Sequence, residues 1–430
     1  MSLEVCERMR GALPGEGFVP GSAQKPLSPA REFYFNPWDA AFRDNPYPHY
    51  QPLVAGPPRL LDWATPVALV ARYADVVAVL SDHQRFSSVR LRSYITEQRI
   101  EVFGTVPNLL FSDPPTHTRL RRLVARAFTA RRVQALEGRI NAVVSALLDA
   151  AVRRGATIEI MEVLANPLPV IVIAEMLGIS SSDYQCFKNW SDLIIEADNV
   201  EPGREIPVPT RTALGELVEF FKREIERRKH ASSDDLVSLL AAASPDVLSA
   251  EELVAFLVLL LLAGNETTTN LIGNGLLALL SNPQEMARLR EHPALLPCAI
   301  EEMLRYDSPA QAAVRFARAD ATVGGVTIEA GTFVFVLLAA ANRDPAKFAD
   351  PERFDISRSP NDHLAFGEGI HHCLGAPLAR LQGAIAFESL LRRFPAMRLA
   401  EDGEPLRYKG SYFLRGLAAL RVAATGNARA

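Results

Sequence analysis

The chain has 430 residues, of which 48% are hydrophobic and 22% are charged, so it has ample material for a buried core. Its formal net charge of −4 excludes a global attraction to nucleic acid or to an acidic membrane surface. The four cysteines, Cys6, Cys186, Cys298 and Cys373, are widely scattered, which favours a reducing compartment over a disulfide framework.

The first 30 residues are rich in glycine and proline and predict a mobile extension ahead of the fold. Glu4 and Glu7 stand where a signal peptide would need an apolar run. The longest apolar run, which begins at Leu253, is shorter than the ~20 residues that cross a bilayer. We therefore expect a cytoplasmic protein with no membrane span.

Helical patterns dominate the rest of the chain. Between residues 130 and 155 an apolar stripe of period 3.6 ends at Gly155, and residues 215–229 are amphipathic in the same way. Strand patterns are few: PVALVARY, ATVGGVTI with GTFVFVLL, and LAALRV near the end. The Gly-Gly pair in TVGGVTI predicts a hairpin. The sequence therefore predicts a mainly α fold with a small β portion, and the lack of repeated αβ alternation argues against a doubly wound sheet.

The segment SDPPTHTRLRRLVARAFTARRV carries six arginines and no acidic residue after Pro114. Arginine-rich stretches are usually solvated faces, but such a concentration in a slightly acidic protein indicates an acidic partner or a bound anionic group. His117 and Arg121 lie one helical turn apart, so they can hold the same anion.

A long helix is predicted over residues 250–280, with Ser249 and Glu252 as a capping box. The segment after Glu252 is apolar on every side, which predicts burial at the centre of the protein. The polar run from Gly264 to Thr269 interrupts it. Either the threonines bond to carbonyls one turn earlier and Glu266 meets water or an arginine, or the run delivers protons in a groove widened by small residues.

Glu302 and Arg305 stand at i,i+3 on one predicted helix face. Such pairs are usually exposed and contribute little to stability. Arg353, in the segment DPERFD, would complete a buried carboxylate–guanidinium network if the fold brings it near.

The segment FGEGIHHCLG places Cys373 among three glycines and two histidines. A zinc site would need about four ligands, and a nucleophile would need an oriented base, and neither is supplied nearby. A buried, inert cysteine is a fair default for one cysteine alone. An iron-bound thiolate accounts for more of the pattern, because Gly367, Gly369 and Gly375 let amide N–H groups point at sulfur and a helix begins just after it.

These segments resemble the motifs of the cytochrome P450 superfamily, in the family's order. FGEGIHHCLG is similar to its haem-binding loop, AGNETT to its oxygen-activating helix motif, EMLR to its E-x-x-R motif, PERF to its arginine-bearing segment and HTRLRR to its propionate-binding helix. The N-terminal segments FNPWDAAFRDNPYPHY and LSDHQRFSS resemble soluble bacterial members. The resemblance implies a single haem-enclosing domain over residues 31–425, with the P450 fold and a long central helix.

The resemblance also implies a role for individual residues. Cys373 would be the axial ligand of the iron of haem b, with Phe366 beside it, and His117, Arg121, Arg315 and His371 would hold the haem propionates. Glu266 and Thr267 would relay protons to dioxygen, and Glu302, Arg305 and Arg353 would form a structural triad. An electropositive surface for a redox partner would be formed by Arg122, Arg126, Arg131 and Arg132. The substrate pocket would be lined by Leu260, Ala263, Ala310, Ala312, Ala313, Val314 and Phe413.

The function expected from this resemblance is a monooxygenase that hydroxylates or epoxidises a medium-sized hydrophobic molecule such as a terpenoid, steroid, polyketide or fatty acid. Electrons would come from NAD(P)H through a ferredoxin or flavodoxin and its reductase, and the protein would be a monomer. The alternatives are a peroxide-driven or oxidative-coupling reaction on the same haem, a catalytically silent recruitment module with this fold, and a cysteine hydrolase.

Overall fold

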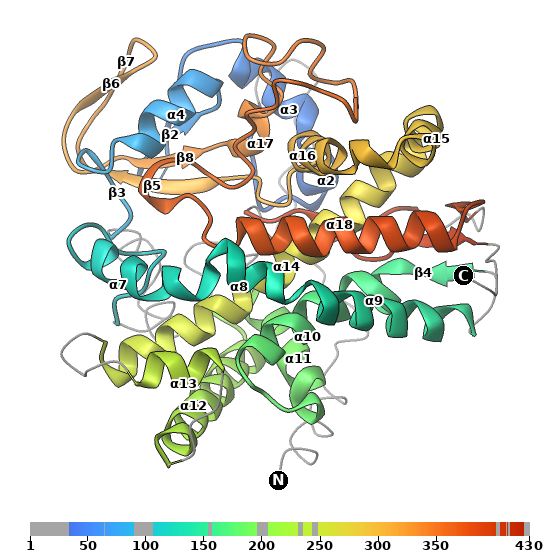
Figure 1. Ribbon diagram of the computed structural model, residues 1–430. Helices are drawn as coiled ribbons and strands as arrows, with labels where there is room; N and C mark the ends of the chain where they lie inside the picture. The colour runs from blue at the N-terminus through green and yellow to red at the C-terminus, as the bar shows by residue number, and fades with distance from the viewer. Residues whose placement is uncertain are drawn as a thin grey trace.

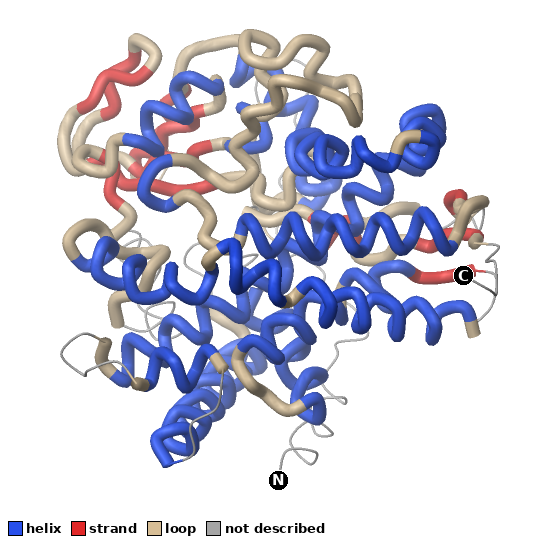
Figure 2. Tube along the Cα trace, in the orientation of Figure 1, coloured by secondary structure: helices blue, strands red, loops and turns tan. Residues whose placement is uncertain are grey.

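The computed structural model describes residues 34–63, 65–89, 106–153, 157–195, 205–230, 235–242, 248–400, 405–409, 411 and 413–424. The extension predicted over residues 1–30 lies outside these residues. Helices dominate the described chain and the strands are short, as the sequence predicted (Figures 1 and 2).

The helices follow one another along the chain with short 3-10 or π turns between some of them. They are α2 (Ala40–Asp44), α3 (Tyr47–Val54), α4 (Tyr73–Ser81), α7 (Thr116–Ala125), α8 (Ala130–Ala135), α9 (Glu137–Val152), α10 (Pro167–Met176), α11 (Tyr184–Ile195), α12 (Val208–His230), α13 (Leu236–Ala241), α14 (Ala250–Ser281), α15 (Pro283–Glu291), α16 (Leu296–Tyr306), α17 (Leu338–Ala341) and α18 (Ala376–Arg393). The short turns are η1 (Arg126–Phe128), η2 (Met161–Ala165), η3 (Ser181–Asp183), η5 (Pro293–Leu295) and η6 (Gly369–His371).

The strands form one larger sheet and three small ones. The larger sheet has the order β1-β2-β8-β5-β3, built from β1 (Arg59–Asp62), β2 (Pro66–Val70), β3 (Phe86–Ser87), β5 (Ala313–Ala317) and β8 (Phe333–Val336). The small sheets join β4 (Thr157–Glu159), β12 (Arg421–Ala423) and β9 (Arg398–Leu399), then β6 (Ala321–Val323) with β7 (Val326–Ile328), and β10 (Tyr408–Lys409) with β11 (Gly416–Leu417). The hairpin predicted from TVGGVTI is confirmed as β6–β7.

The larger sheet is buried on both faces, which explains why PVALV is apolar without alternation. Leu69 and Phe335 belong to a cluster that also contains Phe42 and Tyr50 from α2 and α3. Val70, the next residue of β2 after Leu69, belongs to a cluster on the opposite face of the sheet, and α4 covers that face. Successive side chains of a strand point to opposite faces, so two-sided burial demands an unbroken apolar run.

Helix α14 is the axis of the helical part and runs through the middle of the molecule, with α18, α16, α12 and α10 packed around it (Figure 1). The predicted capping box is present: the Ser249 hydroxyl accepts from the Glu252 amide and the Glu252 carboxylate accepts from the Ser249 amide. The Glu252 carboxylate also receives two hydrogen bonds from Arg119 of α7, one of them 3.0 Å long. The start of α14 is thus fixed both locally and by a distant helix.

One predicted helix is divided in the structure. The stripe between residues 130 and 155 is carried by α8 and α9, which meet at Leu136. Val133, Ile140 and Val143 are buried and Leu136 is half-buried. The apolar stripe continues across the junction, so periodicity alone gives no sign of the break.

Candidate active site

The loop that carries Cys373 connects η6 to α18 and is shaped by its glycines. Gly367 and Gly369 both have φ of +71°, a conformation that side chains with a Cβ rarely adopt. At Gly369 a Cβ would also lie 2.6 Å from the carbonyl oxygen of Leu80. The turn brings the Cys373 amide 2.9 Å from the Phe366 carbonyl oxygen, to which it donates.

The sulfur of Cys373 lies before the first turn of α18. Burial raises the pKa of its thiol, while the backbone N–H groups of Gly375 and Ala376, and then Arg121 and Arg380, act in the opposite direction. The side chain nevertheless keeps accessible surface. Protein atoms thus surround the thiol at depth, and one side stays open. The arrangement suits a thiolate ligand, because amides and a helix N-terminus stabilise negative charge on sulfur.

Arg380 of α18 connects this loop to α16. Its guanidinium donates two hydrogen bonds of 2.7 Å to Glu301, and its carbon lies 4.5 Å from the centre of the Phe366 ring. His363 contributes a further contact to Glu301, with Nε2 3.0 Å from the carboxylate. Neither Arg380 nor Glu301 was singled out in the sequence. Together they hold the ring beside Cys373 in place.

Polar side chains with few partners gather around His371, two residues before Cys373. The rings of His117 and His371 lie 4.4 Å apart between centroids. His117 is buried and its Nε2 has no hydrogen-bond partner among the described residues. The Nε2 of His371 lies 3.1 Å from the Ser88 hydroxyl. Burial, then Arg315 and His117, lower the pKa of His371 to about 3.

Arg315 of β5 belongs to the same group. It is 6% exposed, and its Nη1 donates to the Val314 carbonyl oxygen at 2.8 Å. Burial lowers its pKa to about 10, and Asp113 acts against this only through space. A buried guanidinium without a carboxylate partner is costly. Arg315 and His117 therefore fit a group that brings its own carboxylates, as haem does. Arg121 donates to the His372 carbonyl oxygen at 2.7 Å and lies close enough for its charge to act on His371.

The polar run of α14 has one open side. Ala263 is exposed although most of this helix is buried, and the Thr267 hydroxyl donates to its carbonyl oxygen at 2.8 Å. That bond uses the hydroxyl proton and leaves the oxygen able to accept. Small side chains and an accepting hydroxyl on the open side leave room for a small polar ligand.

Glu266 points to another side of α14 and is 2% exposed. Two lysines that sequence reasoning missed lie close to it: Nζ of Lys188 in α11 is 3.9 Å away and Nζ of Lys409 in β10 is 3.7 Å away. A buried carboxylate requires such partners. No local pattern connects either lysine to Glu266, because each reaches it from a different part of the chain.

The expected substrate-pocket residues do not form one cluster. Gln311 donates to the Phe413 carbonyl oxygen at 2.7 Å, so the segment 310–314 and the C-terminal turn lie side by side. Phe413, Ala312 and Val314 pack in one cluster, Ala310 and Ala313 pack against the cluster on the other face of the sheet, and Leu260 belongs to the large cluster around α14.

The triad expected from the sequence requires a correction. Glu302 and Arg305 form a fully buried ion pair with N–O distances of 2.7 and 2.8 Å. The Arg353 side chain is 63% exposed and only its backbone carbonyl accepts from Arg305. Arg358 takes the third place, with Nε 3.1 Å from Glu302. The turn after residue 350 directs Arg353 outward, and no sequence pattern distinguishes the two arginines.

The arginines expected to meet a redox partner lie on α7, η1 and α8. Arg122, Arg131 and Arg132 are exposed, whereas the side chain of Arg126 lies outside the described part of the chain. Helix α8 packs against α18, which begins beside Cys373. Arg131 and Arg132 thus lie on a helix that packs against the helix following the Cys373 loop.

Among the described helices, α14 is long and apolar enough to span a membrane by length and composition. Of its most apolar 18-residue window, 61% is buried inside the protein. A helix at the centre of a protein core passes the same test.

Comparison with known proteins agrees with this geometry. The sequence model described as "Cytochrome P450" matches residues 210–417. The cytochrome P450 monooxygenase PikC of Streptomyces venezuelae is 42% identical over 89% of this chain and 91% of its own length. The vitamin D(3) 25-hydroxylase of Pseudonocardia autotrophica is 41% identical over 90% and 95%. Among solved structures, the cytochrome P450 PksS of the bacillaene polyketide synthase of Bacillus subtilis matches with a TM-score of 0.83 and 37% identity, over 91% of this chain and all of that one.

Identities of 37–42% over about nine-tenths of the chain show that this protein shares its family and its fold with these relatives. Oxidoreductase activity that depends on haem iron and dioxygen follows from the family. The chain belongs to the cytochrome P450 family of monooxygenases.

Proposed function

We propose that the chain binds haem b through the Cys373 thiolate and inserts one atom of dioxygen into a medium-sized hydrophobic molecule. The observation that carries this proposal is that the loop of Cys373 joins a site for a thiolate to buried donors. The amides of Gly375 and Ala376 favour a thiolate at Cys373. His371, two residues earlier, lies against His117 and near Arg315, and these two are buried donors without an anionic partner among the described residues.

The residues around Cys373 position the cofactor. His117, Arg121, Arg315 and His371 would hold the two propionates by charge and hydrogen bonds. Phe366, fixed by Arg380, packs beside the thiolate and limits water there. When bound, the haem iron would supply the reduction of dioxygen and the cleavage of its O–O bond, and the Cys373 thiolate would hold the iron.

Glu266 and Thr267 would move the protons that this chemistry consumes. Insertion of one oxygen atom requires two electrons and two protons, and the second oxygen atom leaves as water. The Thr267 oxygen, whose own proton bonds Ala263, can accept from water on the open side of α14. Glu266 lies inside the helix bundle with Lys188 and Lys409 at 3.9 and 3.7 Å, so it can pass protons from the interior to that side.

The substrate is proposed to be a terpenoid, steroid, polyketide or fatty acid, free or bound to a carrier. The vitamin D(3) hydroxylase and the polyketide enzyme among the similar proteins support this. Electrons are proposed to pass from NAD(P)H through a ferredoxin or flavodoxin that contacts Arg122, Arg131 and Arg132. The proposal further includes one catalytic domain over residues 31–425, a monomeric state and a cytoplasmic location.

A spectral titration tests the proposal. Purified protein should carry haem with the visible spectrum of a thiolate ligand, and a hydrophobic substrate should shift it toward high spin as water leaves the iron. Cys373→Ala should abolish the thiolate spectrum, while Cys298→Ala, which changes a free exposed cysteine elsewhere, should not. Protein that contains no haem when haem is supplied would contradict the assignment of Cys373.

The choice between dioxygen and peroxide chemistry needs a second measurement. Thr267→Ala should divert most of the electrons into released hydrogen peroxide while reduction of the iron stays normal. Unchanged yield of product per electron would remove Thr267 from the relay and favour a peroxide-driven or coupling reaction.

A further inference from the structure

Glu266 stands at one end of a polar strip on α14. Asn270 and Asn274 follow it at i+4 and i+8, so the three side chains share one face of an otherwise apolar helix. At a rise of 1.5 Å per residue the strip is ~12 Å long. The next position on this face is Ala278. The β10–β11 ribbon covers this face, because Lys409 of β10 approaches Glu266 and Gly416 of β11 lies against Asn270.

Asn270 is the least satisfied polar side chain on this strip. It is fully buried, and neither its Oδ1 nor its Nδ2 has a partner among the described residues. A Cβ on Gly416 would lie 1.8 Å from the Asn270 Oδ1, so any other residue there would displace the amide. Gly416 therefore lies where β11 crosses Asn270, whose side-chain amide has no partner among the described residues.

Of the two polar side-chain atoms of Asn274, one has hydrogen-bond partners among the described residues. Its Nδ2 donates to the carbonyl oxygens of Asp307 and Arg415, at 3.2 and 3.0 Å. Its Oδ1 is buried without a partner in the described part of the chain. Asn274 also lines a cleft of about 460 Å³ together with Ala278, Tyr408 and Asp307.

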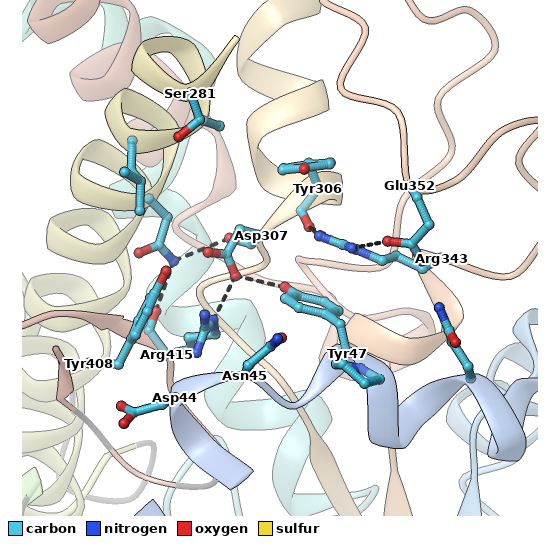
Figure 3. Close-up of a pocket in the computed structure, with 15 residues that line it drawn as sticks. Asp44, Asn45, Tyr47, Ser281, Tyr306, Asp307, Arg343, Glu352, Tyr408 and Arg415 are labelled. Carbon is cyan, nitrogen blue, oxygen red and sulfur yellow. Dashed lines mark hydrogen bonds and ion pairs between the residues drawn. The ribbon is translucent and has the colours of Figure 1, made fainter. Parts of the chain in front are cut away.

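This cleft opens to solvent between α2, α3 and the end of α14. Figure 3 shows Asp307 between Arg415 and Tyr47, with α14 passing beside them. The Asp307 carboxylate accepts from Arg415 Nε at 2.9 Å and from the Tyr47 hydroxyl at 2.7 Å. Exposed polar side chains form the rim: Asp44, Asn45, Gln51, Ser281 and Glu352. Water can therefore reach Ala278 and Asn274 from outside.

Three buried amide atoms in a row, without partners in the described part of the chain, call for water. Buried polar groups in proteins are nearly always hydrogen-bonded, and ordered water supplies the bond where protein does not. Leaving each atom unpaired would cost about 1–3 kcal/mol. An empty cavity, by contrast, is normally lined by apolar groups.

We propose that ordered water on this strip carries protons from the cleft to Glu266, with Asn270 and Asn274 as positioning residues that hold the water. Each proton that leaves Glu266 toward Thr267 is replaced by one from the strip, and solvent in the cleft replaces that one; no electron moves. The inference rests on the proposed relay role of Glu266. The competing route would bring protons past Lys188 on α11, which lies on the other side of Glu266.

Two variants interrupt the strip without touching Glu266. Asn270→Leu keeps the branched shape and the number of side-chain heavy atoms and replaces both polar amide atoms with methyl groups, and Ala278→Leu places apolar bulk between the cleft and Asn274. Both should lower product formation about tenfold, since positioned proton transfer is worth ~10²–10⁴-fold and part of the flow can bypass the block. Both should raise the solvent deuterium isotope effect and the peroxide released per electron. Asn270→Ser, which leaves room for water and a hydroxyl to hold it, should restore most of the rate.

The matched control is Thr269→Val. It removes a buried hydroxyl from another face of α14, where Thr269 donates to the Ala165 carbonyl oxygen at 2.9 Å. It should leave the isotope effect unchanged. An equal isotope effect in the control and the strip variants would mean that general disturbance of α14, not the strip, is responsible, and would overturn the inference.

Two further measurements separate this inference from the proposed function. A crystal structure that resolves ordered water should show it at Asn270 and Asn274; a dry strip would overturn the inference whatever the activity. Glu266→Gln should slow product formation if the relay exists. If Glu266→Gln has this effect while Asn270→Leu and Ala278→Leu do not, only the strip is wrong. If Glu266→Gln has no effect, the relay proposal itself fails, and the strip with it.

Discussion

The Nε of Arg358 lies 3.1 Å from a carboxylate oxygen of Glu302, inside the protein. Glu302 is fully buried, so each guanidinium around it offsets the cost of its desolvation. Arg358 also donates to the carbonyl oxygens of Ala349, Asp350 and Arg353, which fixes the loop after residue 348. Arg358 therefore joins α16 to this loop.

The first prediction compares the two arginines of that loop. Arg358→Met should lower the free energy of unfolding by about 2–4 kcal/mol, because it leaves a buried carboxylate with one guanidinium instead of two. Arg353→Met should change it by less than ~0.5 kcal/mol, since that side chain is exposed. Urea titrations of both variants test the difference. Equal losses would contradict the assignment of Arg358.

The second prediction concerns the glycines before Cys373. Gly367→Ala forces a residue with a Cβ into a positive φ and should cost about 1–2 kcal/mol. Gly369→Ala has the same φ and adds a contact of 2.6 Å with the Leu80 carbonyl oxygen, so it should cost more and reduce haem content. Unfolding midpoint and haem per protein should be measured for both. Equal unfolding midpoints and haem contents in the two variants would show that Leu80 moves aside without loss of stability.

The third prediction is a pH dependence that arises from Glu301. Burial alone would raise the pKa of this carboxyl, but hydrogen bonds and charge from Arg380 and His363 outweigh it and lower the pKa to about 2. Because the pKa is lower in the folded protein, the Glu301 carboxylate contributes its full stabilisation above about pH 4.5. This contribution is lost as the pH falls from there to about 2. The contribution should be about 2–3 kcal/mol, allowing for partial exposure.

The test is the urea midpoint between pH 6 and pH 3 for Glu301→Gln and for Glu329→Gln, an exposed control. Glu301→Gln should be less stable at pH 6 and lose less on acidification. A slope like that of the control would show that Glu301 contributes nothing to the acid dependence.

The fourth prediction concerns the buried donors near His371. Arg315→Met should speed the transfer of haem to an acceptor protein by about 10–100-fold, because a charge-assisted hydrogen bond contributes about 1.5–3 kcal/mol. Arg318→Met is the matched control: Arg318 directly follows β5, and its guanidinium bonds Asp113 and Ser87. Haem transfer as slow in Arg315→Met as in the control would remove Arg315 from the binding site.

The parts that could be predicted from the sequence are those set by local pattern. The capping box and the all-round apolar character identified α14 and its burial, and the glycines around Cys373 indicated the tight turn found in the structure. Burial of the sheet on both faces also agrees with its unbroken apolar strands.

The parts that could not be predicted depend on contacts between distant segments. Lys188 and Lys409 reach Glu266 from α11 and β10, and neither carries a local signal. Arg353 and Arg358 lie in the same irregular loop, where side-chain direction depends on tertiary packing. The break at Leu136 was hidden because the apolar stripe continues from α8 into α9.

The parallel pairing of β2 with β8 has a consequence for the newly made chain. About 260 residues separate Val70 from Phe333, so at 5–20 residues per second a ribosome needs about 13–50 seconds to supply the partner strand. Until then the β1–β2 hairpin presents an apolar strand with an unpaired edge. Unpaired edges of this kind promote association between chains. The interval before residue 336 emerges is therefore when this protein should depend most on chaperones, and when slowed synthesis should do most harm.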